Sequence, residues 1–504
     1  MSSKPEKGKE QNMKVALVMP SITLEECCNK TMARITGSFP PIGLLSIGTV
    51  LKNEGNEVIV LDGSIEPSNN IIGKIERFKP DIVGITALTL MWPKVRLLSR
   101  KLKEKRPHLN IIVGGVHTTI IREKALSELP SVDAIAWGEG EYSMLEYVKN
   151  LSRLDSSGPI SGIAFRRKDG SLVIGSDRQP VKSLDSLPIP DRNLVPVTKY
   201  VGAIEQYKKL PATSMITSRG CPFKCIFCLP GLLGDGVRYR SVDKVIEELK
   251  YLINEFGIRD IAFWDDTFTL NKKRVYAVCE GIIREKLNFT WSAQTRADCV
   301  TPALLGMMAR AGCWKVYYGV ESLVQKNLDT LKKGQTVEQI FDAVRWTKKA
   351  GMEIEASFIF GIPGQTFQEG LQTIRLAKKL NPDYAKFLCL CPYGKLRKEA
   401  KKYGNLITKN ERDYGRSVIT FVPFSMTKDE LQKLYYTAYR QFYLRPAIIY
   451  KRLKKVLNPL DFRKSIKGLS VLGSFLKQQM AGKLKKTCYT TVSVDSENRE
   501  QVSS

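Results

Sequence analysis

Residues 218–228 have the sequence Ser-Arg-Gly-Cys-Pro-Phe-Lys-Cys-Ile-Phe-Cys, which is the most informative stretch of the chain. Its three cysteines, Cys221, Cys225 and Cys228, follow directly on a short apolar run, so the loop begins where a predicted strand ends. One such loop can wrap three thiolates around three irons of a [4Fe–4S] cube, whereas full ligation by protein needs four. The missing fourth thiolate leaves one iron open to a substrate or cofactor.

Zinc is the competing ligand for such a loop. A structural zinc site usually closes its shell with four ligands. The chain has only two histidines, His108 and His117, and both are remote from the loop in sequence. Eleven cysteines in 504 residues are too sparse for a disulfide scaffold, and the pattern favours metal binding in a reducing compartment.

The rest of the chain after residue 212 repeats strand-like and helical patterns in alternation. This favours a partial (βα)6 barrel over residues 212–410, with its chemistry at the carboxyl ends of the strands. A shorter βα series over residues 13–152 predicts a doubly wound, Rossmann-like domain with a parallel sheet. The predicted strands are 15–19, 58–61, 82–86, 111–113, 134–137, 214–218, 260–264, 290–295, 315–320, 354–360 and 385–390. The predicted helices include 42–53, 93–105, 120–129, 242–255, 273–286 and 337–350.

The remaining segments differ in composition. Residues 153–211 are rich in proline and predict a linker with a short strand near 162–166, and residues 1–12 and 487–504 predict disordered tails. Residues 411–486 form a basic helical region, in which 440–486 carries thirteen Lys or Arg and one acid. A basic amphipathic helix can lie on an anionic membrane or cover a protein core, and both interpretations stay open.

Composition narrows the class of protein. The chain is 43% hydrophobic and 26% charged, which excludes a wholly disordered, collagen-like or polytopic membrane protein. Its 79 Lys and Arg against 51 Asp and Glu give a net charge of +28, which favours an anionic partner. Residues 1–12 contain no apolar core of a signal peptide, and no apolar run reaches the roughly 18 residues of a membrane span. We therefore expect a cytoplasmic protein, with peripheral contact with an anionic membrane left open.

The cysteine loop, with Phe227 directly before its third cysteine, resembles that of radical S-adenosylmethionine (SAM) enzymes. In that family the open iron chelates the amino and carboxylate groups of SAM. An electron from the cluster then gives a 5′-deoxyadenosyl radical that abstracts a hydrogen atom.

Further positions match this family at successive strand ends. The resemblance implies that Asp265 and Asp266 contact the SAM amino group and that Arg296 pairs with its carboxylate. It also implies that Glu321 lies near the ribose hydroxyls, and that Gly361 and Gly364 let the backbone approach the adenine.

The first domain carries small-residue clusters at the carboxyl edges of its predicted strands. Together with the cysteine loop, this arrangement resembles cobalamin-dependent radical SAM enzymes, and the resemblance covers most of residues 13–410. It implies cobalamin binding by Pro41, Gly43, Thr86, Gly114, Gly115, His117, Gly138 and Glu139. The D-x-H-x-x-G motif of other cobalamin proteins is absent, so His117 is either a hydrogen-bonded loop residue or a metal ligand, and the first is favoured.

The resemblance implies an enzyme with a [4Fe–4S] cluster, SAM and cobalamin, and methyl transfer to an unactivated carbon is the main hypothesis. SAM would then serve twice, as radical source and as methyl donor. The alternative is a radical cyclisation or rearrangement without methyl transfer, as in the anaerobic porphyrin cyclase. A tRNA methylthiotransferase would need a second cluster on three N-terminal cysteines, and only Cys27 and Cys28 precede residue 221. A plain electron carrier would need no open iron.

The expected partners follow from the same chemistry. They are a small-molecule or lipid substrate, an electron donor such as ferredoxin or flavodoxin, and an anionic membrane surface. The sequence argues against nucleic acid, since no aromatic-basic stacking platform is visible. No catalytic residue is named; Cys299, Cys313, Cys389 and Cys391 lie near the predicted barrel mouth, while Cys279 and Cys488 have no ligand spacing.

Overall fold

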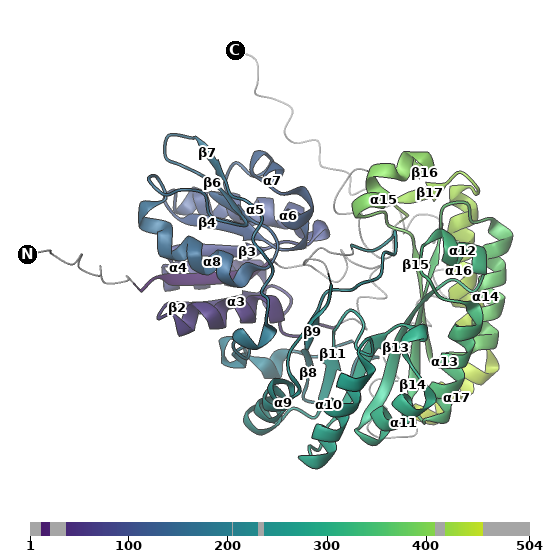
Figure 1. The fold of residues 1–504 in the computed structure, drawn as a ribbon. Helices are drawn as coiled ribbons and strands as arrows, with labels where there is room; N and C mark the ends of the chain where they lie inside the picture. Colours follow the sequence, from purple (N-terminus) through teal and green to yellow (C-terminus); the bar gives the residue numbers. More distant parts are fainter. Residues whose placement is uncertain (1–11, 21–36, 204, 230–235, 409–418, 457–504) are drawn as a thin grey trace, which may run out of the picture.

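The computed structural model describes residues 12–20, 37–203, 205–229, 236–408 and 419–456, which build two α/β units (Figure 1). The first unit is drawn purple to blue, and the second, teal to green, is an open barrel beside it. One continuous hydrophobic core includes Val15 and Leu17 of the first unit together with Ile261 and Phe358 of the second. The two units are therefore packed against each other and not merely tethered.

The first sheet has the order β2-β1-β3-β4-β5-β6-β7, in which β1 to β5 are parallel and β6 and β7 antiparallel. β1 lies between β2 and β3, so the strand order reverses direction beside β1, which makes the switch point where such sheets bind ligands. The strands are β1 (Lys14–Met19), β2 (Glu57–Asp62), β3 (Ile82–Thr86), β4 (Asn110–Gly114), β5 (Ala134–Ala136), β6 (Ile163–Arg166) and β7 (Leu172–Ile174).

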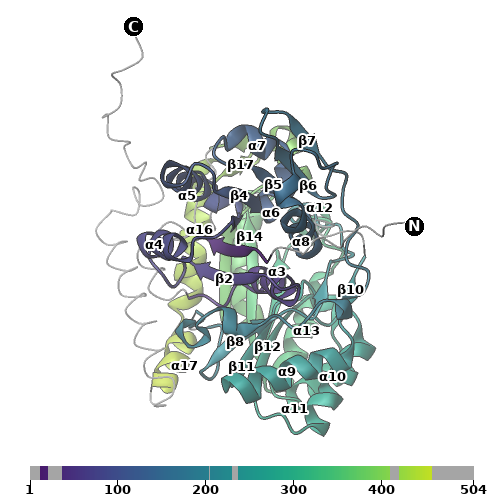
Figure 2. The same cartoon turned by 90° about the vertical axis from the view of Figure 1, so that its left-hand side faces the viewer.

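Helices cover both faces of this sheet, as the doubly wound prediction requires (Figure 2). On one face α3 and α8 bury Leu45 and Tyr147, and on the other α4, α5 and α7 bury Ile75, Trp92 and Leu126. The helices are α3 (Ile42–Asn53), α4 (Ser68–Phe78), α5 (Trp92–Lys105), α6 (Val116–Ile121), α7 (Lys124–Glu128) and α8 (Gly140–Asn150).

One predicted helix of this unit is wrong. The pattern over 120–129 predicts a single helix, but the chain forms α6 and α7, separated at Arg122. Arg122 has φ +55°, a left-handed conformation that interrupts a right-handed helix. Apolar spacing alone does not reveal this break.

The barrel is six-stranded and open, with the order β15-β14-β13-β12-β11-β8 and every neighbouring pair parallel. Its strands are β8 (Ala212–Met215), β11 (Asp260–Phe263), β12 (Thr290–Thr295), β13 (Cys313–Glu321), β14 (Glu353–Phe360) and β15 (Tyr384–Cys389). Its helices are α9 (Val242–Phe256), α10 (Lys272–Arg284), α11 (Pro302–Arg310), α12 (Gln325–Thr330), α13 (Val337–Lys349) and α14 (Phe367–Leu380). The predicted first strand, 214–218, starts earlier and stops at Met215, because Ser218 and Arg219 instead form β9, which pairs antiparallel with β10 (Arg238–Tyr239).

The open edge of the barrel is covered by the chain that follows it. Tyr443 in α16 donates a hydrogen bond to the carbonyl of Ala385 in β15 at 2.8 Å and accepts one from its N–H at 3.0 Å. Tyr439, one turn earlier, makes the same pair of contacts with Phe387. The two hydroxyls thus substitute for a neighbouring strand and blunt an exposed edge. The elements here are α15 (Gly394–Glu399), β16 (Gly404–Leu406), β17 (Phe421–Pro423), α16 (Lys428–Tyr443) and α17 (Pro446–Val456).

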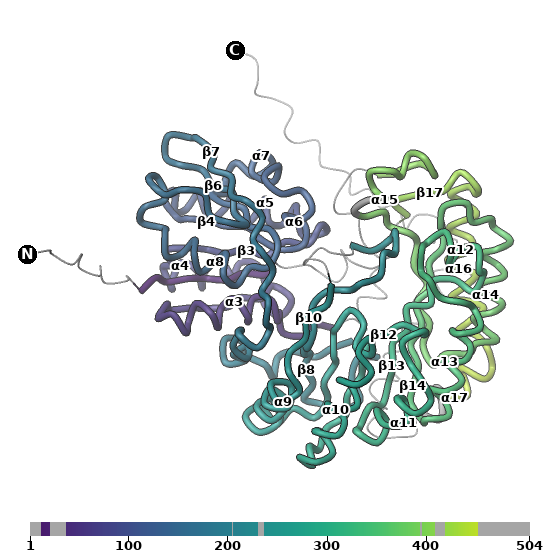
Figure 3. The backbone as a smooth tube through the Cα atoms, viewed as in Figure 1, coloured from purple at the N-terminus to yellow at the C-terminus, as the bar shows by residue number. Residues whose placement is uncertain are grey.

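The segment between the units does more than connect them. β6 and β7, from the predicted linker of 153–211, extend the first sheet. Figure 3 shows the chain after β7 crossing to the barrel. Arg192, which is fully buried, pairs there with Glu248 at 3.2 Å, and Tyr200 donates to Asp62 at 2.9 Å. The linker is therefore part of the interface between the units.

Of the basic helical region predicted over 411–486, only residues 419–456 are described, and the rest lies outside the described residues. Among the helices of the described chain, none combines the length and apolar character that crossing a bilayer requires.

Candidate functional site

The cysteine loop lies between β9 and β10, which close its base. Gly220 has φ +97°, and a Cβ there would lie 2.2 Å from the carbonyl oxygen of Gly236, so only glycine fits where the two ends of the loop meet. Cys221, Cys225 and Cys228 are free thiols, close enough for their charges to influence one another. The predicted loop is thus formed, with residues 230–235 outside the described part.

The donor chemistry of this loop fits an iron–sulfur cluster. Burial raises the pKa of the Cys225 thiol, and the nearby Lys333 and Arg296 cations oppose that shift by favouring the thiolate. Within the described residues, no three Cys, His, Asp or Glu side chains converge on the position of a single metal ion. A cube does not require such convergence, because its cysteines bind different irons.

Arg296, at the end of β12, contacts the cysteine loop directly. Its guanidinium lies 3.5 Å from the centre of the Phe223 ring, and its Nη1 donates to the sulfur of Cys225 at 3.7 Å. Nε and Nη2 donate to Asp298 at 3.0 and 2.9 Å, and Nη2 also donates to the carbonyl of Lys333. Arg296 is therefore beside the expected SAM site, but much of its donor capacity is taken by the protein itself.

Glu321, at the end of β13, forms a buried ion pair at the same mouth. Its Oε1 lies 3.0 Å from Nζ of Lys333, and Oε2 accepts from the Ser357 hydroxyl at 3.3 Å. Its φ of +64° is a conformation that costs a non-glycine residue energy, and such strain concentrates at functional sites. Lys333 also lies over the ring of Phe227, 5.6 Å from its centre, which joins this pair to the cysteine loop.

The two aspartates after β11 have different surroundings. Asp265 is 1% exposed and accepts from the Thr217 N–H at 2.6 Å and hydroxyl at 2.5 Å, and from the Ser218 N–H at 3.2 Å. Its carboxylate thus holds the chain that enters the cysteine loop. Asp266 instead lines the cavity described below, where burial raises its pKa against a hydrogen bond from Gly220. The structure brings Asp266 to the cavity and leaves Asp265 behind it.

Gly361 and Gly364 follow β14 and have φ values of +80° and +73°. The Gly361 N–H donates to the side chain of Gln365 at 2.8 Å, which closes the turn. No atom lies within 4 Å of the Cβ position of Gly364, so the backbone there is open to a flat ligand.

A cavity lies between the two units at the carboxyl edge of the first sheet. Its walls include all the predicted cobalamin residues except Pro41 and His117, namely Gly43, Thr86, Gly114, Gly115, Gly138 and Glu139. Apolar Leu17, Ile85 and Ile112 line it as well, and the barrel contributes Ile216, Ser218, Arg219, Arg240, Trp264 and Asp266.

Glycines give this cavity its open space, and a large planar cofactor requires such space. At Gly43 and Gly138 the Cβ position has no atom within 4 Å, so a side chain there would project into unfilled space. At Gly115, with φ +114°, a Cβ would lie 2.8 Å from the Ala87 carbonyl, so the close turn needs glycine. These residues fit the corrin that the sequence implies.

His117 does not line the cavity. It is 7% exposed, its Nδ1 lies 3.1 Å from the Thr89 hydroxyl, and its ring is 4.5 Å from that of Trp92. His117 is therefore a packed, hydrogen-bonded residue, but it lies in the first turn of α6 and not in a loop as the sequence interpretation had it.

On the barrel side of the cavity, sequence reasoning named Asp266 but missed Trp264. Trp264 is 37% exposed, lies edge-on to Phe39 at 5.3 Å between ring centres, and directly precedes Asp265 and Asp266. A large aromatic residue at a strand end was a signal that could have found it. Of the remaining cysteines, Cys279, Cys299, Cys313 and Cys389 are buried and Cys391 is half-buried, while Cys488 lies outside the described residues.

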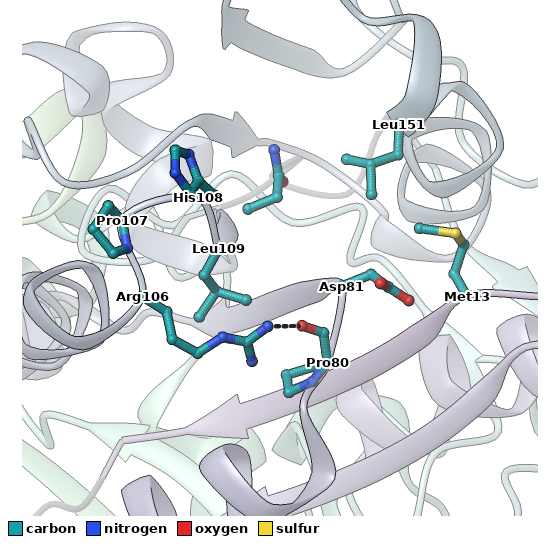
Figure 4. A pocket seen from close by; sticks show the side chains of 9 residues that line it. Met13, Pro80, Asp81, Arg106, Pro107, His108, Leu109 and Leu151 are labelled. Atoms are coloured by element: carbon teal, nitrogen blue, oxygen red, sulfur yellow. Dashed lines mark hydrogen bonds between the residues drawn. The ribbon is translucent and has the colours of Figure 1, made fainter.

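A second hollow lies at the opposite edge of the first sheet (Figure 4). Met13, Asp81, His108 and Leu151 surround it, and Arg106 donates to the Pro80 carbonyl at 3.1 Å. The amino ends of β1, β3 and β4 meet at this edge, away from the ligand edge of parallel sheets.

Comparisons with known proteins agree with this architecture. The family model of the radical SAM superfamily matches residues 215–377, and that of the B12 binding domain matches residues 29–148. The uncharacterized methyltransferase PH0819 of Pyrococcus horikoshii is 36% identical over 444 residues, which cover 87% of this chain and 94% of that protein. The anaerobic magnesium-protoporphyrin IX monomethyl ester cyclase of Rubrivivax gelatinosus is 29% identical over 427 residues, 83% and 76% of the two chains.

A solved structure has the same fold. The radical SAM methyltransferase TsrM of Kitasatospora setae, with cobalamin and a [4Fe–4S] cluster bound, superposes with a TM-score of 0.68. The superposition covers 87% of this chain and 90% of that one at 16% identity, so it compares folds only.

Proposed function

Because the chain belongs to the family of radical SAM proteins that carry a B12 binding domain, we propose that it transfers a methyl group to an unactivated carbon of a small molecule. Its cofactors are accordingly a [4Fe–4S] cluster, SAM and cobalamin. The observation that carries the proposal is the cavity lined jointly by the edge of the first sheet and by Ser218, Arg219 and Asp266 beside the cysteine loop. This arrangement supports placing radical formation and methyl delivery next to one shared substrate.

Bound together, the cluster and SAM supply a 5′-deoxyadenosyl radical, and cobalamin carries the methyl group. We assign Cys221, Cys225 and Cys228 to three irons. Arg296 and Lys333 hold positive charge beside Cys225, where the carboxylate of SAM would lie.

The other SAM contacts are assigned to residues at or directly after the carboxyl ends of the barrel strands. Asp266, at the cavity, would accept from the amino group, and Glu321 would accept from the ribose hydroxyls. Gly364, with no atom near its Cβ position, would leave room for the adenine, and Gly361 would shape the turn beside it. Phe227, within the cysteine loop, packs against the apolar cluster that contains Ile359 and Ile362 and would exclude water there. Asp265 acts through the backbone of Thr217 and Ser218 and is a positioning residue.

On the other side of the cavity, Gly43, Thr86, Gly114, Gly115 and Gly138 would hold the corrin. Trp264 faces them from the barrel and would limit water between the two cofactors. Excluding water matters because a carbon radical in an open site would be lost to side reactions.

The test uses anaerobically reconstituted protein, a chemical reductant, SAM deuterated in its S-methyl group and a small-molecule extract. We expect 5′-deoxyadenosine together with an extract-derived product that carries the intact deuterated methyl group. The Cys225→Ser variant, treated in parallel, should give neither. Formation of 5′-deoxyadenosine with a product that never carries the label would contradict methyl transfer.

That second outcome would favour cyclisation or rearrangement, the alternative that the similarity to the cyclase of Rubrivivax gelatinosus supports. Both reactions begin with hydrogen abstraction, so the label and not the nucleoside separates them.

The partners are a further part of the proposal. The net charge of +28 supports an anionic electron donor such as ferredoxin or flavodoxin, and a lipid or membrane-associated substrate. In α17, Ile449 and Tyr450 are 37% and 70% exposed beside Lys451, as at an interfacial helix. We expect Tyr450→Glu to weaken binding to anionic vesicles at low salt, whereas Phe424→Glu, at an equally exposed aromatic residue, should not. Equal loss in both variants would count against a membrane role for α17.

A further inference from the structure

Two arginines face each other at the base of the cysteine loop. β9 and β10 form a two-stranded antiparallel ribbon in which Arg219 is the register partner of Arg238. Like charges directly opposite on a ribbon destabilise it. The strand pair that closes the cysteine loop therefore requires a negative charge beside its two arginines.

The first domain supplies that counter-charge. Oε1 of Glu139 lies 3.0 Å from Nη1 of Arg219 and 2.9 Å from Nη2 of Arg238, so one oxygen bridges the two guanidiniums. Glu141 adds a second contact, with Oε1 at 2.6 Å from Nη2 of Arg219. Both acids lie at the start of α8, in the part of the cavity wall where the first domain meets the barrel.

These ion pairs are largely removed from water. Glu139 and Glu141 are 8% and 3% exposed, and the side chains of Arg219 and Arg238 are 18% and 16% exposed. A buried pair is costly to break, because removing one partner leaves the other charge without compensation. Contacts of this kind hold two surfaces in one relative position.

Glu139 has no capacity left for the corrin. Besides the two contacts of Oε1, its Oε2 accepts from Nη1 of Arg238 at 2.9 Å and from the Val181 N–H at 2.7 Å. A carboxylate offers about four acceptor sites, and all are used here. The predicted role of Glu139 as a direct cobalamin ligand is thereby replaced by a contact between domains.

We propose that Glu139, Glu141, Arg219 and Arg238 form an interdomain latch that fixes the cysteine loop relative to the wall of the corrin cavity. Arg219 lies in β9, two residues before Cys221, so its ion pairs tie the strand that enters the loop to the first domain. The latch thereby sets the separation between cluster and cobalt. The assignment rests on the proposed function insofar as it takes this cavity to be the cobalamin site.

The first measurement needs no cofactor. Amide hydrogen exchange on the full chain should be about tenfold faster at residues 139–141 and 218–221 in Arg219→Gln than in the wild type. Arg219→Lys, which keeps the charge but not the forked geometry, should lie between them. The control Lys250→Gln, which removes an ion pair with Glu285 within the barrel, should leave these segments unchanged.

The second measurement uses the loaded enzyme. Dipolar broadening between cobalt(II) and the reduced cluster in electron paramagnetic resonance reports their separation, and it should weaken in Arg219→Gln. The variant should still form 5′-deoxyadenosine while losing coupling of that product to substrate turnover. If Arg219→Gln does not fold, Glu141→Gln, nearly identical in shape, should show the same directions to a smaller degree.

Wild-type exchange in Arg219→Gln and Glu141→Gln, or unchanged dipolar broadening, would overturn the latch. A wild-type preparation that binds no cobalt would instead overturn the proposed function, while the exchange result would still decide whether the four residues hold the domains together.

Discussion

The two sides of the central cavity are built in opposite ways. On the barrel side, the charged residues near the cysteine loop already have polar partners within the protein: Asp265 accepts from Thr217, Arg296 donates to Asp298, and Lys333 donates to Glu321. On the side of the first sheet, the lining is mainly glycine and apolar residues, with open space at two Cβ positions. The barrel side therefore orients its ligands with a preformed polar network. The sheet side instead provides space for a ligand, because glycines stand where side chains would otherwise fill the cavity.

Removing a thiol should give the largest effect and confine it to the barrel side. In Cys225→Ser, we expect no cluster and no detectable 5′-deoxyadenosine, because a hydroxyl is a poor iron ligand, while cobalamin binding persists. Iron and cobalt analysis after anaerobic reconstitution measures both. Cys279→Ala, which removes a buried thiol from α10, should keep its iron. Loss of both metals in Cys225→Ser would break the independence of the two sides.

Filling the sheet side should produce the converse result. The Cβ position of Gly43 is open space beside the cavity, so Gly43→Leu should occupy the room meant for the corrin and lower cobalamin affinity by at least about tenfold. Iron content should stay at the wild-type level. Gly306→Leu is the matched control, because Gly306 is also helical with an open Cβ position but lies in α11, away from the cavity. Unaltered cobalt retention in Gly43→Leu would mean that the corrin binds elsewhere.

The contrast between the two sides also explains what the sequence could predict. The strands with strong apolar runs, such as β3 and β14, lie within a residue or two of their predicted bounds, since burial on both faces requires such runs. The cysteine loop and the glycine clusters could be predicted from the sequence, because the residues of each motif are close together in the chain.

Contacts between segments that are distant in the chain could not be predicted from the sequence. Glu139 and Arg219 are separated by 80 residues, and only the packing of one domain on the other brings them together. For the same reason the sequence assigned Asp265 and Asp266 one role, although the backbone directs Asp265 to Thr217 and Asp266 to the cavity. Position at a strand end predicts nearness to a site, but side-chain direction decides the function.

A smaller effect should follow from the cation beside the cluster. Arg296 donates to the sulfur of Cys225, and hydrogen bonds and positive charge at a cluster favour its reduced form. Arg296→Gln should therefore lower the reduction potential by on the order of tens of millivolts, measured by potentiometric titration. Arg310→Gln, an exposed position on α11, should leave the potential unchanged. An unchanged potential in Arg296→Gln would restrict this residue to binding SAM.

The smallest effect concerns the Glu139 carboxylate, on the sheet side, and its pH-dependent contribution to the free energy of unfolding. Burial alone would raise the pKa of Glu139, but hydrogen bonds and charges from Arg238 and Arg219 hold it below its ordinary value of 4.5. The unfolded chain therefore binds a proton more readily than the folded one. It follows that Glu139 stabilises the folded chain fully at pH values above the ordinary pKa of 4.5. This stabilisation is lost as the pH falls through the lowered pKa of the folded state.

Glu139→Gln lacks this ionisation, so its deficit in unfolding free energy relative to the wild type should be largest near neutral pH and should shrink in acid. Urea denaturation of the cofactor-free chain over a pH series measures the difference. Glu247→Gln, at a half-exposed surface pair with Lys244, should show a small deficit in comparison, because solvent screens that pair. A deficit for Glu139→Gln that stays constant with pH would show that its amide replaces the carboxylate in the contacts with both arginines, and that charge does not join the two sides of the cavity.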